Sequence, residues 1–144
     1  MKSLAQNRRA YFDYEILEKF VAGIELTGHE VKSLKIKGAD LTGARVLIHE
    51  GEAFLTGAAI TSFQPRNAPP DFNPNRSRRL LIARKEIISL AARLQTGLTL
   101  VPLKAYTNKQ GLIKIEVALA RFRKKIDKRE LIKKRETERE IRKI

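Results

Sequence analysis

The last 24 residues, 121–144, constrain the fold most, because they carry too much charge to join a hydrophobic core. They hold twelve Lys or Arg against five Asp or Glu, and no apolar residue lies between Ile132 and Ile141. Their net charge of +7 is half of the +14 of the whole chain. Burial cannot offset the ordering entropy of such a segment, which is roughly 1–2 kcal/mol per residue. We therefore predict a compact domain over residues 1–120 and a basic tail over 121–144, disordered until it binds an anionic partner.

The composition fits a single folded domain that binds a polyanion. Hydrophobic residues make up 42% of the 144 residues, which is enough for a core. A pI near 10.4 favours nucleic acid as the partner, with an anionic membrane surface second. No apolar run approaches the roughly 18 residues that span a bilayer, and the first residues lack the apolar stretch of a secretory signal. The absence of cysteine excludes disulfides and fits a cytoplasmic protein.

Lys2 to Arg9 form a short basic arm that we expect to be loose until it binds. After this arm, alternation of apolar and polar residues predicts strands in the first half of the chain. It covers residues 14–26, where Gly23 indicates a bulge, and residues 46–55, which read as a hairpin. A further strand is expected to end near Ile60 and Phe63.

Helical spacing and turn residues predict short helices between the strands. Residues 27–38 form the first, with a glycine to end it. A proline-rich loop covers 64–75, and Asn73 followed by proline is typical of a helix start. We therefore predict two more helices, over 74–82 and 84–95.

Two strands near the end of the domain complete the predicted sheet. They cover residues 98–106 and 112–119, joined by a hairpin loop, and Pro102 indicates an edge position or a bulge. The strands follow one another in hairpins and do not alternate with long helices. The sequence therefore predicts a mainly β fold, a small antiparallel barrel of about six strands with short helices.

Catalytic and metal-binding residues are poorly represented. The two histidines, His29 and His49, lie far apart in the sequence, and no Ser–His–Asp set is available. A helical zinc site needs a second histidine, which His29-Glu30 lacks. We expect no enzymatic activity, no metal and no cofactor; a nuclease that uses His29 and Glu30 remains the enzymatic alternative.

Cations in three regions indicate where a nucleic acid would bind. Arg8 and Arg9 precede two aromatic residues, and rings can stack on bases while cations hold phosphates. The outer side of the helix over 27–38 is charged. Three arginines stand at a predicted helix start, where the positive end of the helix dipole disfavours cations. A bound phosphate would offset this repulsion. These regions contribute Asn7, Arg8, Arg9, Glu30, Lys32, Lys35, Arg76, Arg78 and Arg79, and Leu81 lies either in the core or at the rim, pressing on an unstacked base.

The tail is close to being helical. Asp127 and Glu130 have the spacing of a capping box, and Glu130 precedes Lys134 in the favourable i,i+4 order. These contributions are too weak to hold a helix alone, so we expect the tail to become helical against a partner.

A set of motifs along the chain falls in the order of a known family. They are residues 7–10, 22–24, 28–34, 40–41, 51–55, 78–81, 98–103 and 127–129. The chain resembles the small protein B (SmpB) family, the tmRNA-binding or SsrA-binding proteins of trans-translation. The resemblance covers nearly the whole chain. Single motifs are weak, but the ordered set is specific.

The resemblance implies a small antiparallel OB-like barrel with three short helices. It also implies a cytoplasmic monomer without enzymatic activity. It implies binding to the tRNA-like domain of tmRNA and delivery to stalled ribosomes together with elongation factor Tu. It also implies that the tail enters the empty mRNA channel at the small-subunit decoding centre, becomes helical there and stands in for codon–anticodon pairing. A generic OB-type RNA-binding or ribosomal protein is the alternative.

By position, the resemblance links Asn7 and Leu81 to tmRNA binding, and matches Glu30, Lys32 and Ser33 to the signature helix of the family. Three residues depart from its pattern: Val21 replaces a glutamate, Phe122 a glycine, and Ile126 a histidine or tyrosine suited to stacking. The stretch of the tail that we expect to bind the ribosome comprises Arg123, Lys124, Lys125, Ile126, Asp127, Lys128, Arg129, Ile132, Lys133, Lys134 and Arg135.

Overall fold

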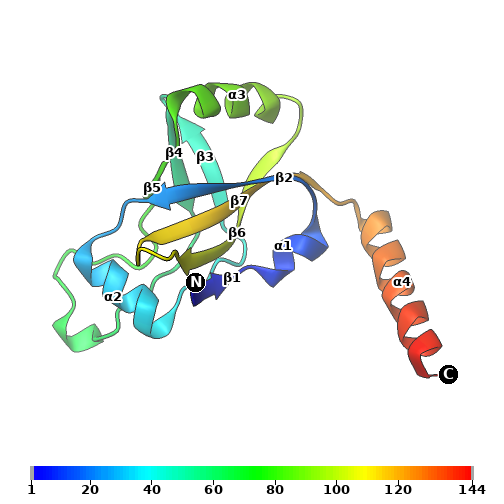
Figure 1. Cartoon of the computed structure of the whole chain (residues 1–144), viewed down its shortest axis with the longest axis horizontal. Coiled ribbons are helices and arrows are strands. Elements are labelled where there is room, and N and C mark those ends of the chain that lie inside the picture. Colours follow the sequence, from blue (N-terminus) through cyan, green and yellow to red (C-terminus); the bar gives the residue numbers. More distant parts are fainter. Residues whose placement is uncertain (1, 144) are drawn as a thin grey trace.

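The computed structural model describes the backbone of residues 2–143, and the side chains of these residues except 125–127, 138 and 140–143. Over this range it contains seven strands, four α-helices and one short 3-10 turn, Pro65–Asn67 (Figure 1). The strands are β1 (Lys2–Gln6), β2 (Tyr14–Ile24), β3 (Arg45–His49), β4 (Glu52–Thr56), β5 (Arg78–Leu81), β6 (Thr99–Thr107) and β7 (Ile113–Phe122). The helices are α1 (Arg8–Asp13), α2 (Gly28–Lys37), α3 (Arg84–Leu94) and α4 (Lys125–Lys143).

Six of the strands close into a ring. The antiparallel order runs β6-β3-β4-β5-β2-β7, and β7 pairs again with β6, while β1 extends the sheet from β6. The β3–β6 join is the narrowest, with one residue pair, Val46 and Leu100. Closure removes most of the free strand edges that an open sheet would leave. The predicted small antiparallel barrel is confirmed.

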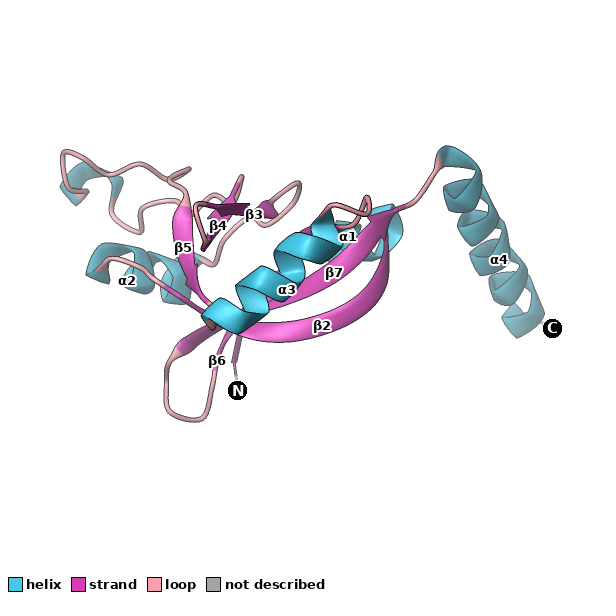
Figure 2. Ribbon diagram, turned by 90° about the horizontal axis from the view of Figure 1, so that it is seen from above, coloured by secondary structure: helices cyan, strands magenta, loops and turns pink. Residues whose placement is uncertain are grey.

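The barrel interior holds the main core, and two helices cover its ends. The inward positions of the strands supply residues such as Leu100, Val117 and Leu119. Leu90 of α3 joins this core, and Leu34 of α2 faces the small apolar cavity at the other side. Figure 2, seen from above, shows α3 in front of β2 and β7, where Arg93 of α3 pairs with Glu18 of β2, and Figure 1 shows α2 beside the opposite end.

A second apolar cluster holds α1 on the outside of the sheet. Ala10 of α1 is buried together with outward-facing residues of β6 and β7. The outward and inward residues alternate along β7, so Ala118 packs under α1 while Val117 and Leu119 face the barrel interior. The segment that we predicted as a loose basic arm is therefore ordered, and that prediction is wrong. The reason is tertiary: β1 pairs with β6 over Lys2–Gln6, which local sequence does not reveal.

Two local predictions around β5 are also wrong. The expected helix over 74–82 is a turn followed by strand β5, because the Asn73 side chain accepts from the Asn75 N–H and forms a turn. The expected strand near Ile60 is reduced to an isolated bridge between Asp40 and Ala59.

The bulge expected at Gly23 lies instead between Ile16 and Glu18. Gly23 has another role, since a Cβ built there would lie 3.3 Å from Leu81 on the neighbouring strand. The bulge expected at Pro102 is present, between Pro102 and Lys104 of β6.

The basic tail leaves the barrel as a helix. Strand β7 runs to Phe122, two residues form a link, and α4 then projects away from the barrel (Figure 1). Because α4 begins at Lys125, Asp127 lies within the helix and not at its N-cap. That the free tail is disordered and folds on the ribosome stays a prediction. No helix in the described range is long and apolar enough to cross a membrane.

Candidate nucleic-acid interface

Helix α2 is fixed at both ends by local sequence. Thr27 and Glu30 form a capping box, in which the Glu30 N–H donates to the Thr27 hydroxyl and the Thr27 N–H donates to the Glu30 carboxylate. Gly38 ends the helix with φ 75°, and a Cβ there would lie 2.6 Å from the Leu4 carbonyl oxygen of β1. Glycine is therefore required where α2 meets β1.

Glu30 is the centre of a buried ion network. Only 2% of its surface is exposed, and Arg78, with 0% exposed, donates from Nε to Glu30 Oε2 at 2.6 Å. Arg76 donates to the other carboxylate oxygen at 2.5 Å. The remaining Arg78 nitrogens donate to the carbonyls of Ala58 and Pro74 at 3.1 and 3.0 Å. The network thus connects α2, β5 and both ends of the loop between β4 and β5.

Hydrogen bonding keeps the Glu30 carboxylate ionised. Burial raises the pKa of Glu30, but hydrogen bonds from Arg76, the Thr27 N–H and Arg78 outweigh it and lower the pKa from 4.5 to about 2. Glu30 and Arg78 are each other's buried counter-ion, so removing either side chain would leave an unpaired charge in the interior.

The proline-rich loop is held against α2 by a second set of contacts. The Phe63 N–H donates to the Ser33 hydroxyl at 3.1 Å, and His29 Nε2 lies 2.8 Å from the Ser62 hydroxyl. The His29 ring also contacts the rings of Phe63 and Phe72, with centroids 5.0 and 4.9 Å apart. His29 therefore belongs to a loop-holding cluster.

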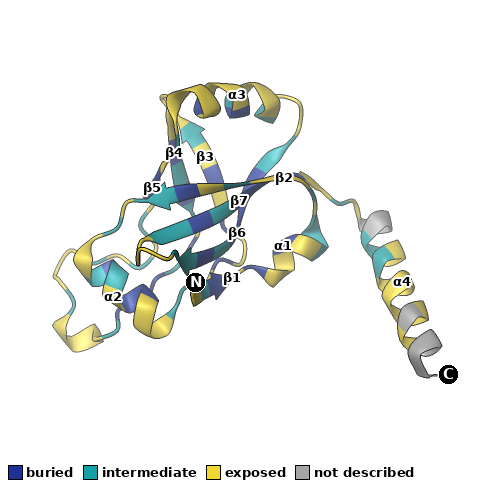
Figure 3. Ribbon diagram, in the orientation of Figure 1, coloured by how far each residue is buried: buried dark blue, intermediate teal, exposed yellow. Residues whose placement is uncertain are grey.

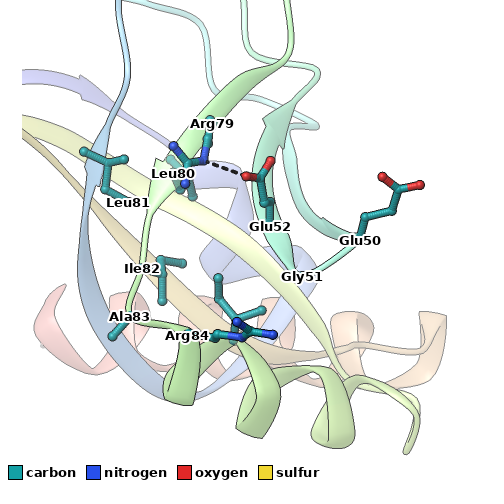
Figure 4. A pocket seen from close by; sticks show the side chains of 10 residues that line it. Glu50, Gly51, Glu52, Arg79, Leu80, Leu81, Ile82, Ala83 and Arg84 are labelled. Carbon is teal, nitrogen blue, oxygen red and sulfur yellow. Dashed lines mark ion pairs between the residues drawn. The ribbon is translucent and has the colours of Figure 1, made fainter.

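Strand β5 turns every second residue outward, and Leu81 stands between two hollows. Arg78 and Leu80 are buried, whereas Arg79 and Leu81 are exposed. One hollow, of about 680 Å³, is lined by Arg79, Arg84 and the acidic β3–β4 turn (Figure 4). The other, of about 300 Å³, is mainly apolar and includes Leu112 and Lys114. Leu81 therefore forms an apolar ridge between the two hollows, which we call the Leu81 ridge, and cations line both hollows. Such a ridge suits contact with the unstacked bases of a folded RNA, and the cations suit contact with its phosphates.

Arg79 is paired but remains accessible. It contacts Glu52 at 3.4 Å and Glu25 at 3.6 Å, and all three side chains are about half exposed or more (Figure 4). Exposed ion pairs contribute little stability, so these partners can give way to a phosphate at small cost.

Asn7 is a buried cap that sets the position of Arg8 and Arg9. Its side chain accepts from the Ala10 N–H at 3.2 Å and donates to the Pro102 carbonyl at 2.9 Å. It is 4% exposed. Both arginines are exposed on α1, and Arg9 also contacts Asp13 and the Phe12 ring.

The start of α4 is attached to α1. Lys128 Nζ lies 3.0 Å from Asp13 Oδ1, and the ammonium lies 4.7 and 5.6 Å from the ring centroids of Phe122 and Phe12. The Arg123 N–H donates to the Asp13 carbonyl at 2.8 Å. Burial raises the pKa of Asp13, but the hydrogen bond and charge of Lys128 and then of Arg9 hold it below its ordinary value.

Comparison with known proteins decides the family. The model of the SmpB protein family matches residues 4–144. The chain belongs to this family. It is 46% identical to the SsrA-binding protein of Chlorobaculum tepidum over 96% of this chain and 88% of that protein. It is also 46% identical to the SsrA-binding protein of Thermosipho africanus, over 98% and 95% of the two chains.

A solved structure agrees with the assignment to the SmpB family. The chain is 40% identical to a chain in the structure described as "tmRNA-SmpB: a journey to the center of the bacterial ribosome", with a TM-score of 0.69. The alignment covers 89% of this chain and 93% of the other. The resemblance inferred from the ordered motifs is therefore confirmed.

The structure divides the predicted RNA-binding residues into two groups. The interior holds the residues that shape the surface: Asn7, Glu30, Ser33 and Arg78. The surface holds those that can touch a ligand, with Arg76 half buried: Arg8, Arg9, Lys32, Lys35, Arg76, Arg79 and Leu81. The idea that Arg78 offers its charge to a phosphate is wrong, because Glu30 and two carbonyls occupy its guanidinium in the interior.

The predicted ribosome-binding residues follow α4. The side chains of Lys125, Ile126 and Asp127 lie outside the described residues, so their roles stay predictions. Lys128 is largely covered by the barrel, and Arg123 is half buried. The exposed members are Lys124, Arg129, Ile132, Lys133, Lys134 and Arg135. In the ribbon of Figure 3, much of the described part of α4 is yellow, the colour of exposed residues, whereas the strands carry the dark blue of buried ones.

Sequence reasoning missed two parts of the interface. The pairing of Glu30 with Arg76 and Arg78 joins residues 46 and 48 positions apart, and no local pattern indicates it. The Thr27–Glu30 capping box, in contrast, has a recognisable spacing in the sequence and could have been predicted.

Proposed function

We propose that this chain is a non-catalytic adaptor of trans-translation. Its barrel binds the tRNA-like domain of tmRNA, and its tail meets the small ribosomal subunit at the decoding centre and in the mRNA channel. The observation that carries the proposal is the match to the SmpB family over nearly the full length of the chain. The relatives that align with it over that length are named SsrA-binding proteins.

The barrel surface supports the first half of the proposal. Its exposed cations stand on α1, α2 and β5, and the Leu81 ridge lies beside them. Double-stranded RNA is recognised by shape and phosphate contacts, and its loops offer unstacked bases. A rigid surface with scattered cations and one apolar ridge fits that kind of ligand better than an unstructured strand.

The tail supports the second half. The later turns of α4 stand away from the barrel (Figure 1), so exposed cations of the tail can follow a second RNA while the first remains bound. Elongation factor Tu delivers the complex of this protein with tmRNA to the ribosome. There the complex takes the place of a codon–anticodon pair. The protein acts in the cytoplasm as a monomer and uses neither metal nor cofactor.

Binding to a transcript of the tRNA-like domain tests the barrel's role. If about six phosphates are contacted, log K should fall with log salt with a slope of about 4 to 5. Replacing both Lys32 and Lys35 with Gln should reduce the slope by about two. Replacing Lys85, which is exposed on α3, is the control for a cation outside the proposed contacts. A flat salt response would contradict the proposed phosphate contacts. Equal competition by an unstructured oligonucleotide would favour a generic RNA-binding protein.

The Leu81 ridge gives a second test. Leu81→Ala should weaken binding by about tenfold, the value of one apolar side-chain contact, while leaving the fold intact. Ile88→Ala on α3 is the matched control, because Ile88 is 63% exposed and Leu81 is 52% exposed. Equal affinities of the two variants would remove Leu81 from the interface.

A further inference from the structure

We propose that the hollow of about 680 Å³ beside Leu81 binds one unstacked guanine, whose edge is read by Glu52 while Arg79 holds the Glu52 carboxylate in place. We call this hollow the base pocket. The inference deepens the proposed function, and it rests on that function where the guanine belongs to the tRNA-like domain. It gives a specific role to an acidic residue on a surface where the other contacts come from cations and one leucine.

The base pocket has the size and the walls that a nucleotide needs. Its volume of about 680 Å³ lies within the roughly 300–1,000 Å³ typical of small-molecule sites. Leu81 and Ile82 form an apolar wall, and Leu81 is 52% exposed, so a base can press against it directly. Glu52 and Arg79 form a charged wall (Figure 4). The two walls match a base, which stacks through its ring faces and forms hydrogen bonds at its edge.

Arg79 orients the Glu52 carboxylate. The Nε of Arg79 lies 3.4 Å from Glu52 Oε1, and its Nη1 lies 3.6 Å from Glu25 Oε2. The pair connects β5 to the first residue of the neighbouring strand β4. Each carboxylate oxygen has two lone pairs, so the contact with Arg79 leaves both Glu52 oxygens able to accept from a ligand. The pocket therefore presents an oriented, charged acceptor.

A carboxylate with both oxygens available favours guanine among the RNA bases. An ionised carboxylate accepts hydrogen bonds and cannot donate them. The Watson–Crick edge of guanine presents two adjacent donors, N1–H and the 2-amino group, whereas adenine, cytosine and uracil each present only one donor group there. Guanine can thus form a bidentate contact with Glu52, and hydrogen bonds to an ionised acceptor are stronger than neutral ones.

Two arginines allow RNA to approach this acidic residue. Arg84 is exposed at the start of α3, and the Nη2 amino group of Arg79 takes part in neither of its ion pairs. Both side chains line the pocket and can contact the phosphates that flank the base. Their charges offset the repulsion between the RNA backbone and the carboxylates of Glu50 and Glu52. Because cations and carboxylates nearly balance here, the pocket selects a base more than it adds general affinity for phosphate.

Titration of the ¹⁵N-labelled full chain with GMP, IMP and AMP tests the pocket without a folded RNA. IMP differs from GMP only in lacking the 2-amino group, and all three carry the same phosphate, so binding to other cations is equal. We expect GMP to shift the amide signals of the β3–β4 turn and of β5. We also expect it to bind about tenfold more tightly than IMP or AMP, because only GMP makes both hydrogen bonds.

Two variants assign the preference to one carboxylate. Glu52→Gln should abolish the preference for GMP, because a Gln amide cannot accept from both guanine donors. Glu25→Gln is the matched control, since it removes the other carboxylate paired with Arg79, which does not line the pocket, and it should keep the preference. Equal affinities for GMP and IMP in the parent, no shift at the pocket with any of the nucleotides, or a preference that survives in Glu52→Gln would each overturn the base pocket.

Binding of the tRNA-like transcript separates this inference from the proposed function. Glu52→Gln should bind the transcript about tenfold more weakly than Glu25→Gln does. Equal binding by the two variants would overturn the assignment of the guanine to the tRNA-like domain. If the parent fails to bind the transcript, the proposed function fails, while the nucleotide titrations still decide the base pocket.

Discussion

The barrel and α4 place their charges in opposite surroundings. In the barrel, the Glu30 carboxylate and the Arg78 guanidinium are buried, and each Arg78 nitrogen donates a hydrogen bond, to Glu30 or to a carbonyl of the β4–β5 loop. In α4, exposed cations line a helix that is attached mainly at its first turns. A buried network specifies one structure, whereas an exposed row of cations keeps its charge available for a partner. The difference indicates that the barrel shapes one RNA-binding surface and that the tail is built to be received elsewhere.

The largest expected effect is the loss of the Glu30 charge. Glu30→Gln should destabilise the fold by about 3–5 kcal/mol, because it leaves the fully buried Arg78 without its counter-ion. The midpoint of urea denaturation measures this. Glu25→Gln removes an exposed pair with Arg79 and should cost at most about 1 kcal/mol. Equal midpoints would show that the barrel does not depend on this network.

Acid should remove the same contribution. The folded-state pKa of Glu30 is depressed from 4.5 to about 2, so its stabilisation is complete above pH 4.5 and is lost as pH falls towards 2. The difference in unfolding free energy between the parent and Glu30→Gln should shrink by about 3 kcal/mol over that range. A constant difference down to pH 2 would contradict the ionised network.

Asn7→Ala should have an intermediate effect, about 2 kcal/mol, since it removes a helix cap and leaves the Pro102 carbonyl without its donor. Thermal denaturation measures the loss. Gln6→Ala is the control, because Gln6 is exposed and its side-chain bonds are long. Weaker RNA binding by Asn7→Ala would then reflect a displaced α1 and not a lost direct contact.

The smallest effect on stability should come from removing the tail. A chain of residues 1–127 should unfold within about 1 kcal/mol of the full chain, because only the partly exposed contacts of Lys128 with Asp13 and Phe122 are lost. Chemical denaturation of both chains gives the comparison. A large loss would mean that α4 is an integral part of the barrel.

The sequence predicted most elements whose own residues carry their pattern. The β3–β4 and β6–β7 hairpins and helices α2 and α3 follow from periodicity and turn residues. Strand β5 was missed because Arg78 occupies an inward position, which hides the alternation that would identify a strand. Strand β1 was missed because its order depends on pairing with β6, far away in the sequence.

The candidate site was predictable to the extent that it consists of exposed cations. Lys32, Lys35 and Arg79 lie on the surface as their charge suggests. Glu30 and Arg78 could not be assigned correctly, because a buried ion pair looks like any other charged pair until the partners are seen together. Local sequence indicated charge, and tertiary structure decided which charges are available.

The central claim is that the barrel binds RNA without the tail, while the tail is needed on the ribosome. The most direct test measures the affinity of residues 1–127 for the tRNA-like transcript and the tagging of stalled chains by the same protein. The account predicts nearly unchanged affinity and no tagging. Loss of transcript binding on removal of the tail, or full tagging without it, would contradict the account.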